Sequence, residues 1–325
     1  MAKELTYREA IREALVDAMR ADERVLFMGE DVGRAGGSFK ASVGLIDEFG
    51  PARIVDTPIS ETGFTGAALG MAITGLRPVV EIMFADFMLV TMDQIINSMA
   101  KYRFMSGGQT TVPVTIRAVG GAGLRFGSQH SATAESWMLP FPGLKVVCPA
   151  AAPDAYTLLR AAISDDNPVV VIEHKALYGL KGPVETIAPG EDAWKARVVR
   201  EGKDATIVAT LAMLHRAEKA AEILEQEGID AEVIDPRVLR PFDFGTVVQS
   251  VKKTKRLFMV AEESAYAGWT GTVGLRVTQE AFDYIDAPPE AITPPEAPPA
   301  FSPKLEDAYL PSPEEIAQRV RLGLG

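Results

Sequence analysis

Apolar residues recur at two spacings along this chain, and each spacing predicts one type of element. Between residues 11 and 19 they fall on one helical face, and Thr6 with Glu9 forms a capping box that predicts the start of that helix. Short apolar runs at residues 25–28, 53–56, 79–84, 112–117, 144–148 and 169–173 predict buried strands, most of them separated by helical stretches. This alternation predicts a mostly parallel sheet with helices on both faces.

The second half of the chain repeats this alternation after a break. Glycine, proline and charged residues interrupt the periodicity between residues 176 and 200, which is typical of a connection. Beyond it, strands are predicted at residues 205–210, 231–235 and 256–260, with helices at 215–227 and from Asp243. The sequence therefore predicts an α/β protein with domains at residues 1–180 and 201–325 and a linker at 181–200.

Seven prolines lie between residues 288 and 303. Because proline donates no backbone hydrogen bond and fixes φ, this stretch predicts an extended segment rather than a helix or a central strand. Two interpretations are open: a surface connector to a last helix at residues 312–322, or a docking arm for a partner subunit.

Charge and composition narrow the class of protein. The chain of 325 residues carries 33 Lys and Arg against 44 Asp and Glu, a net charge of −11, which argues against nucleic acid or an anionic membrane as a partner. Its single cysteine, Cys148, excludes an internal disulfide and a multi-cysteine zinc site. The longest uncharged run, residues 62–76, is too short to cross a bilayer. We therefore expect a cytoplasmic protein whose partners are small molecules or proteins.

Acidic residues follow two of the predicted strands. Glu61 follows the strand at 53–56 and begins a helix, and ligands of parallel α/β sheets bind at such strand ends. The alternative is a glutamate that only stabilises the helix dipole. Glu30 and Asp31 follow the strand at 25–28, where they could act as an acid/base pair or remain solvated turn carboxylates.

A glycine-rich polar loop spans residues 120–137 and contains His130. Long loops inside compact domains are usually functional, and a histidine titrates near neutral pH, so His130 is a candidate for proton transfer. The alternative is a histidine that only hydrogen-bonds its neighbours.

Two further patterns favour packing over ligand binding. Gly63, Gly66 and Gly70 share one helical face without a phosphate-binding fingerprint, which predicts close helix packing within the chain or against another subunit. Methionine and isoleucine recur at helical spacing within residues 86–103, a pattern typical of core or of a subunit interface.

A family resemblance connects these features. The motifs VLFMGEDVG (25–33), DTPISE (56–61), RPVVEIMFAD (77–86), QHS (129–131), PGLKVV (142–147) and EVIDPR (232–237) lie in the same order as in a known family. Over nearly its whole length the chain resembles the β subunit of the thiamine-diphosphate-dependent decarboxylase component of 2-oxoacid dehydrogenase complexes. Residues 81–84, 92–95 and 173–182 are most similar to acetoin dehydrogenase β subunits, although pyruvate and branched-chain homologues share most of the framework.

The resemblance implies a pyrimidine-binding transketolase-like domain followed by a transketolase C-terminal-like domain. It implies that Glu61 hydrogen-bonds the cofactor's aminopyrimidine ring and favours its imino tautomer. It implies that His130 acts as acid/base when the acyl group passes to a lipoyl arm. The positions that match the pyrimidine side of the cofactor site are Glu30, Ile59, Ser60, Met83 and Phe87.

The resemblance also implies ions and partners. The positions that match a structural potassium site, built largely from main-chain carbonyls, are Val114, Ala162, Ile163, Asp165 and Asn167. The family's magnesium and diphosphate motif, Gly-Asp-Gly with a downstream asparagine, is absent from the sequence. Magnesium is therefore expected on a separate α subunit, in an α2β2 heterotetramer.

The activity implied is that of an oxidoreductase of pyruvate or acetoin type, which cleaves or decarboxylates its substrate and acylates the lipoyl group of a dihydrolipoyl acyltransferase. A branched-chain 2-oxoacid β subunit and a diverged, non-catalytic assembly subunit are the alternatives. Two departures bear on this choice. Met83 replaces the glutamine of pyruvate and branched-chain members, and His-Ser-Ala-Thr follows Gln129 in place of His-Ser-Gln-Ser.

Overall fold

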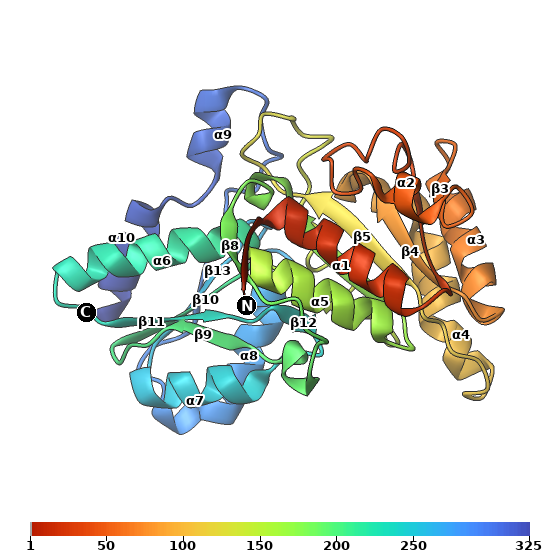
Figure 1. Cartoon of the computed structure of the whole chain (residues 1–325). Coiled ribbons are helices and arrows are strands. Elements are labelled where there is room, and N and C mark those ends of the chain that lie inside the picture. The colour runs from red at the N-terminus through yellow and green to blue at the C-terminus, as the bar shows by residue number, and fades with distance from the viewer. Residues whose placement is uncertain (1) are drawn as a thin grey trace. The chain divides into compact units, whose positions relative to one another are not determined.

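The computed structural model describes residues 2–325, which divide into two compact units (Figure 1). Unit 1 comprises the chain up to Gly120 together with Trp137–Ala193, and unit 2 comprises Gly121–Ser136 and Trp194–Gly325. The loop that contains His130 therefore belongs to unit 2, although the strands on either side of it belong to unit 1. Residues 181–200, expected to form a linker, contain strands β8 (Lys181–Val184) and β9 (Arg197–Arg200).

Unit 1 contains the predicted parallel sheet. Its strands lie in the order β6-β7-β5-β4-β2-β3, and every neighbouring pair is parallel. The strands are β2 (Val25–Gly29), β3 (Ile54–Asp56), β4 (Arg77–Ile82), β5 (Thr115–Gly120), β6 (Lys145–Val147) and β7 (Val169–His174). Most are buried along their whole length, because helices cover both faces of such a sheet. Strand β1 (Lys3–Thr6) pairs with β8 in a separate antiparallel ribbon.

The first helix of unit 1 begins where the capping box predicts. The Glu9 amide donates to Thr6 Oγ1 at 3.2 Å, and the Thr6 amide donates to Glu9 Oε2 at 2.8 Å. This helix, α1 (Tyr7–Ala21), packs against α5 (Ala152–Ser164), and the two lie side by side in Figure 1. The other helical segments of the unit are α2 (Leu45–Phe49), α3 (Glu61–Ile73), α4 (Ala100–Met105), η1 (Ala85–Thr91), η2 (Asp93–Met99), η3 (Lys175–Leu177) and η4 (Glu191–Trp194).

The run at residues 86–103 folds less regularly than its spacing indicates. It passes from the 3₁₀ helix η1 through the π-helix η2 into α4. Met88, Ile95 and Met99 are nonetheless buried, so the predicted packing role is confirmed. Of the three glycines on α3, Gly66 lies against Gln94 of η2, whereas the described chain places nothing within 4 Å of a side chain built at Gly70.

Unit 2 is a second α/β layer structure. Its sheet has the order β14-β13-β10-β11-β9, and only β9 runs antiparallel to its neighbour. Helices α6 and α10 cover one face, and α7 and α8 cover the other (Figure 1). Besides β9, the strands of this sheet are β10 (Ala205–Ala209), β11 (Ala231–Asp235), β13 (Leu257–Val260) and β14 (Glu290–Ile292). Strand β12 (Val238–Arg240) also comes from this part of the chain but lies outside the sheet. The helices are α6 (Leu211–Gln226), α7 (Phe244–Thr254), α8 (Trp269–Ala281), η5 (Phe282–Tyr284), α9 (Pro303–Tyr309) and α10 (Pro313–Leu324).

Between residues 288 and 302 the proline-rich stretch forms neither a helix nor a central strand, as predicted. Residues 290–292 contain no proline and form β14, an edge strand paired with β13. Pro303 begins α9, because the first position of a helix needs no amide donor. No helix in the part of the chain that the structure describes is long and apolar enough to span a membrane.

A buried ionic cluster lies at the centre of the unit 1 sheet. The Arg117 guanidinium on β5 donates to both Glu173 carboxylate oxygens at 2.8 Å and to Glu81 Oε2 at 2.6 Å. The Tyr178 hydroxyl also donates to Glu173. Burial raises the pKa of Glu81, while the Arg117 charge opposes that rise. One guanidinium therefore joins strands β4, β5 and β7 through two carboxyl groups.

Replacing Arg117 by leucine tests this cluster. The substitution leaves two buried carboxyl groups without their cation, which costs about 3–5 kcal/mol of unfolding free energy in comparable sites. We expect a large fall in the urea unfolding midpoint of Arg117→Leu. The control is Arg24→Ala, whose exposed pair with Asp22 contributes little, so its midpoint should stay close to the parent's. Equal midpoints for the two variants would show that Arg117 is not needed to hold the sheet.

Candidate active site

The sequence-predicted acidic residues come together at one edge of the unit 1 sheet. Glu30 follows β2, Glu61 begins α3 after β3, and Met83 follows β4. These three parallel strands are neighbours in the order β4-β2-β3, so their carboxyl ends lie at the same edge. This is the edge where ligands bind in open α/β sheets.

Glu61 is buried although it is the first residue of a helix. Only 8% of its surface is exposed, whereas Ile59, two residues earlier, is 85% exposed. Its neighbour Thr62 fixes the helix start by donating from Oγ1 to the Val90 carbonyl at 2.7 Å. A glutamate that only stabilises a helix dipole needs no burial, so the position favours the ligand-binding interpretation.

Glu30 provides the second carboxyl group. Its Oε1 is buried and, among the described residues, has no hydrogen-bond partner. Burial raises the pKa of Glu30, and the nearby charges of Glu61 and Asp31 raise it further. A buried acceptor without a partner is costly, and a ligand that donates an N–H would satisfy it.

The backbone around these carboxyl groups is held by a close contact between two loops. The Gly33 amide donates to Asp56 Oδ1 at 2.6 Å, and the Thr57 amide donates to the Gly29 carbonyl at 3.0 Å. A side chain at Gly33 would place its Cβ only 2.5 Å from Asp56 Oδ2. Glycine at this position therefore lets the segments that carry Glu30 and Glu61 lie against each other.

Apolar side chains line the same strand ends. Two predicted site residues are half-buried there: Met83, which directly follows β4, and Phe87, which lies in η1. The Phe87 ring meets Phe84 edge to face at 6.2 Å, and Phe84 meets Phe39 at 5.6 Å. This apolar surface beside two carboxyl groups suits a flat polar ring.

His130 belongs to unit 2, whereas Glu30 and Glu61 belong to unit 1. It is half-buried, and its amide donates to the Gly127 carbonyl at 3.3 Å. Glu263 accepts from both the Ser136 amide and its hydroxyl, at 3.2 and 2.5 Å, and Glu262 accepts from the Ala122 amide. The histidine loop is thus held at both ends.

Three buried glutamates around this loop were missed in the sequence. Burial raises the pKa of Glu135 well above its usual range, and the charges of Glu263 and Glu262 add to the rise. Thr210 Oγ1 donates to one Glu135 oxygen at 3.3 Å, and the other is buried without a partner in the described chain. Glu262 and Glu263 follow strand β13, and that position at a strand end was the available signal.

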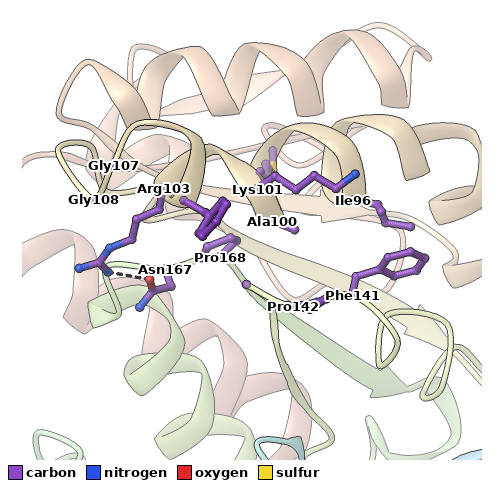
Figure 2. Close-up of a pocket in the computed structure, with 13 residues that line it drawn as sticks. Ile96, Ala100, Lys101, Arg103, Gly107, Gly108, Phe141, Pro142, Asn167 and Pro168 are labelled. Atoms are coloured by element: carbon purple, nitrogen blue, oxygen red, sulfur yellow. Dashed lines mark hydrogen bonds between the residues drawn. The ribbon is translucent and has the colours of Figure 1, made fainter.

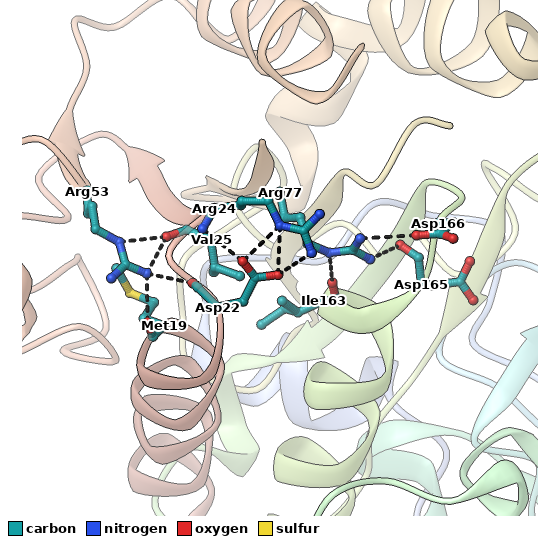
Figure 3. A network of polar contacts seen from close by, with 9 residues as sticks. All are labelled: Met19, Asp22, Arg24, Val25, Arg53, Arg77, Ile163, Asp165 and Asp166. Carbon is teal, nitrogen blue, oxygen red and sulfur yellow. Dashed lines mark hydrogen bonds and ion pairs between the residues drawn. The ribbon is translucent and has the colours of Figure 1, made fainter. Parts of the chain in front are cut away.

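The residues predicted to bind potassium lie together where α5 ends. The Val169 amide donates to the Val114 carbonyl, the Asp165 amide donates to the Ala162 carbonyl, and Asn167 contacts the Asp165 side chain. Arg77 donates to the Ile163 carbonyl at 3.0 Å and to the Asp165 carbonyl at 2.7 Å, and Figure 3 shows these three residues together. Two of the expected carbonyl ligands, those of Ile163 and Asp165, thus already accept hydrogen bonds from a guanidinium.

A separate apolar groove of about 810 Å³ lies beside α4 (Figure 2). Ile96, Phe104, Phe141 and Pro168 are among its lining residues, and Arg103 donates to Asn167 Oδ1 at 2.6 Å at one end. It contains none of the predicted catalytic or pyrimidine-side residues. Part of its lining comes from the run at residues 86–103, whose pattern is typical of core or of a subunit interface.

Comparisons with known proteins identify the family. A family model described as "Transketolase, pyrimidine binding domain" matches residues 3–181, and one described as "Transketolase, C-terminal domain" matches residues 194–316. The pyruvate dehydrogenase E1 component subunit beta of Rhizobium meliloti is 45% identical over 321 residues, covering 98% of this chain and 69% of that protein. The chain therefore belongs to the family of transketolase-like dehydrogenase β subunits.

A second relative represents the acetoin branch of these β subunits. The acetoin:2,6-dichlorophenolindophenol oxidoreductase subunit beta of Cupriavidus necator is 44% identical over 331 residues, covering 99% of this chain and 98% of that protein. A solved structure titled "Split gene transketolase, inactive beta4 tetramer" aligns with a TM-score of 0.79 at 24% identity and covers 98% of each chain. The predicted family resemblance and the two-domain transketolase-like fold are confirmed.

The raised pKa of Glu30 makes stability depend on pH in a defined direction. Because this pKa is higher in the folded than in the unfolded chain, the stabilisation is complete below the unfolded pKa and is lost as pH rises through the folded one. We expect Glu30→Gln and the parent to have the same urea midpoint at acidic pH. As pH rises through the folded pKa of Glu30, only the parent loses this stabilisation, so Glu30→Gln should become the more stable protein. Urea midpoints measured from the acidic range to neutrality test this.

Glu61→Gln is the matched control for that titration. It removes only the repulsion from Glu61, so the pKa of Glu30 should fall partway and the difference caused by Glu30→Gln should shrink without vanishing. If the urea midpoints of Glu30→Gln and the parent differ by the same amount at every pH, the pKa of Glu30 is not raised in the folded protein and the interaction between the two carboxyl groups is contradicted.

Proposed function

We propose that this chain is the β subunit of a thiamine-diphosphate-dependent dehydrogenase of pyruvate or acetoin type. It cleaves or decarboxylates its substrate and passes the acyl group to the lipoyl group of a dihydrolipoyl acyltransferase. The observation that carries the proposal is the pair of carboxyl groups at the carboxyl ends of the unit 1 strands, the buried Glu61 and the half-buried Glu30 with its buried Oε1, in a chain of this family. Membership of the family implies the use of thiamine diphosphate.

The unit 1 site fits the pyrimidine half of this cofactor. Glu61 would hold a ring nitrogen by a hydrogen bond, and the unpartnered Oε1 of Glu30 would accept from the exocyclic amine. When bound, thiamine diphosphate would supply a positively charged thiazolium ring that can take up the electron pair released when the bond next to the substrate carbonyl breaks. Burial strengthens the hydrogen bond to Glu61, because little water competes with it.

The remaining residues bind, shield and move protons. Met83 and Phe87 would cover the pyrimidine ring, and Ile59 and Ser60 would contact it where α3 begins. His130 would donate or accept a proton at its imidazole when the acyl group leaves for the lipoyl arm, as expected of a histidine in an acid/base role.

The second half of the cofactor site is proposed to come from an α subunit. The sequence has no Gly-Asp-Gly motif for magnesium and the diphosphate, so these would be held mainly by that partner in an α2β2 assembly. Ile59, Leu89 and Val90 are large apolar residues exposed near Glu61, and exposed apolar groups of this kind mark interaction surfaces. A partner that covers them would also exclude water from the carboxyl pair.

For the cation site at the end of α5, we propose that Arg77 takes the place of potassium. Its guanidinium donates to the Ile163 and Asp165 carbonyls and pairs with the Asp166 carboxylate at 3.1 Å. The side chain is almost completely buried there. A permanent charge in this position would make the fold independent of the ion, since the same carbonyl groups are already stabilised.

Turnover by the assembled enzyme tests the proposed activity. Purified α and β subunits with thiamine diphosphate, magnesium and a dye acceptor are offered pyruvate, acetoin and branched-chain 2-oxoacids in turn. We expect turnover of pyruvate or acetoin, and we expect Glu61→Gln to lower it by about 10²- to 10⁴-fold, the usual contribution of a positioned acid/base group. Glu23→Gln, which changes an exposed carboxylate, is the control.

Each other result of that assay points to a named alternative. Full activity in Glu61→Gln would identify a non-catalytic assembly subunit. Turnover of branched-chain substrates alone would assign the chain to that class. Lack of acetoin turnover would exclude the acetoin version while leaving pyruvate.

Potassium dependence tests the role of Arg77. We expect the melting temperature of the parent to change by less than about 1 °C when potassium chloride is replaced by choline chloride, a shift well under that of a lost stabilising contact in a domain of this size. Arg77→Met should melt lower and should recover in part when potassium is added back. If the parent protein loses stability in choline chloride, the site binds potassium and the proposed role of Arg77 is wrong.

A further inference from the structure

The histidine loop of unit 2 is held along its middle by the C-terminal part of the chain. We call residues 299–307 the arm; it contains the end of the proline-rich stretch and the first residues of α9. Figure 1 shows α9 beside the loop that follows β5. Residues more than 170 positions apart in sequence meet there.

Glu306 is the central contact of the arm. Its side chain is completely buried, and its carboxylate accepts from the Arg125 amide at 3.1 Å and from Arg125 Nη1 at 2.5 Å. Asp307, which is mostly exposed, accepts from Arg125 Nη2 at 2.6 Å. A buried carboxylate that accepts from both a main-chain amide and a guanidinium fixes its partner strongly in position.

The backbone at Arg125 explains why such a contact is needed. Arg125 has a φ of +65°, a left-handed conformation that residues other than glycine adopt at an energetic cost. Nothing in the residue type favours this conformation. The contacts with Glu306 hold the amide and the side chain of the same residue, so they stabilise the turn that the loop makes there.

Two further contacts extend the arm toward His130. Ser128 Oγ donates to the Pro299 carbonyl at 2.7 Å, and a side chain at Gly127 would lie 3.6 Å from Phe301 Cβ. The His130 amide in turn donates to the Gly127 carbonyl. The turn that carries His130 therefore begins at the residue that lies against the arm.

The ends of the loop are fixed by different residues. Glu262 accepts from the Ala122 amide, and Glu263 accepts from Ser136. These anchors hold the two ends of the loop, and the arm contacts its middle at Arg125, Gly127 and Ser128. The proline-rich stretch was interpreted as a surface connector or as an arm for a partner subunit. Its end instead contacts the histidine loop of the same unit, which is a third interpretation.

We propose that Glu306 is a positioning residue for His130, and that the arm sets where the histidine side chain stands during lipoyl acylation. The inference about activity rests on the proposed function of His130; the inference about the loop does not. Glu306 acts through Arg125 and the turn at Gly127 and does not itself contact a reacting group.

Hydrogen–deuterium exchange on the assembled α and β subunits tests the loop directly. We expect Glu306→Gln to raise amide exchange in peptides covering residues 122–136, while exchange in α1 stays unchanged. The matched control is Glu296→Gln, which removes an exposed carboxylate from the same proline-rich stretch. Unchanged loop exchange in Glu306→Gln would overturn the proposal.

A kinetic comparison shows whether the loop position matters for chemistry. We expect Glu306→Gln to lower acylation of a lipoyl domain by about 10- to 100-fold, because small misplacements of a reacting group are costly, while dye reduction and the KM for the oxo acid change less than about twofold. A purely structural defect would lower both activities together and would overturn the positioning role.

Failure of the proposed function has its own signature. If Glu306→Gln frees the loop and neither it nor His130→Ala slows lipoyl acylation, the arm holds the loop as proposed and His130 is not the acid/base group. Should Glu306→Gln not assemble, Arg125→Lys retains the charge but loses the two-nitrogen contact. It should free the loop to a smaller extent, and a loop as protected as the parent's would overturn the proposal.

Discussion

The arrangement of unit 1 depends on a single guanidinium at the centre of its sheet. Arg117 lies fully buried on β5 and compensates carboxyl groups on the strands to either side, Glu81 on β4 and Glu173 on β7. Buried carboxylates without a cation are strongly unfavourable, so these three strands are stable together only in this register. Strand β4 in turn pairs with β2, whose end carries Glu30. The ionic cluster and the candidate site are thus connected through two neighbouring strands.

The candidate site contrasts with that cluster. In the centre of the sheet every carboxyl group meets a donor, whereas at the sheet edge Glu30 and Glu61 lie near each other and one buried oxygen lacks a partner in the described chain. An unsatisfied buried acceptor is costly, and a ligand that donates a hydrogen bond would satisfy it. The same sheet therefore stabilises its core with paired charges and leaves its carboxyl edge with acceptors available for a ligand.

Local patterns in the sequence predicted most of the elements and the position of Glu61. The capping box at Thr6, the helix starts at Asp243 and Ser312 and the buried strands all depend on neighbouring residues, and each is found in the structure. The assignment of residues 121–136 to unit 2 could not be predicted this way, because it depends on contacts with residues 262–307. The Arg77 contacts could not be predicted for the same reason. A guanidinium that donates to carbonyls nearly 90 positions away produces no periodic pattern in the sequence.

The placement of the histidine loop has a consequence for how the chain folds during synthesis. The strands β5 and β6 on either side of the loop can join the unit 1 sheet as soon as residues 2–193 are made. The loop between them cannot reach its final conformation at that stage. Its anchors at residues 262–263 and 299–307 leave the ribosome more than a hundred residues later. A chain cut short before residue 299 would keep the carboxyl pair and its sheet but would leave the histidine without its support. Folding of this segment is therefore a late event that depends on the last part of the chain.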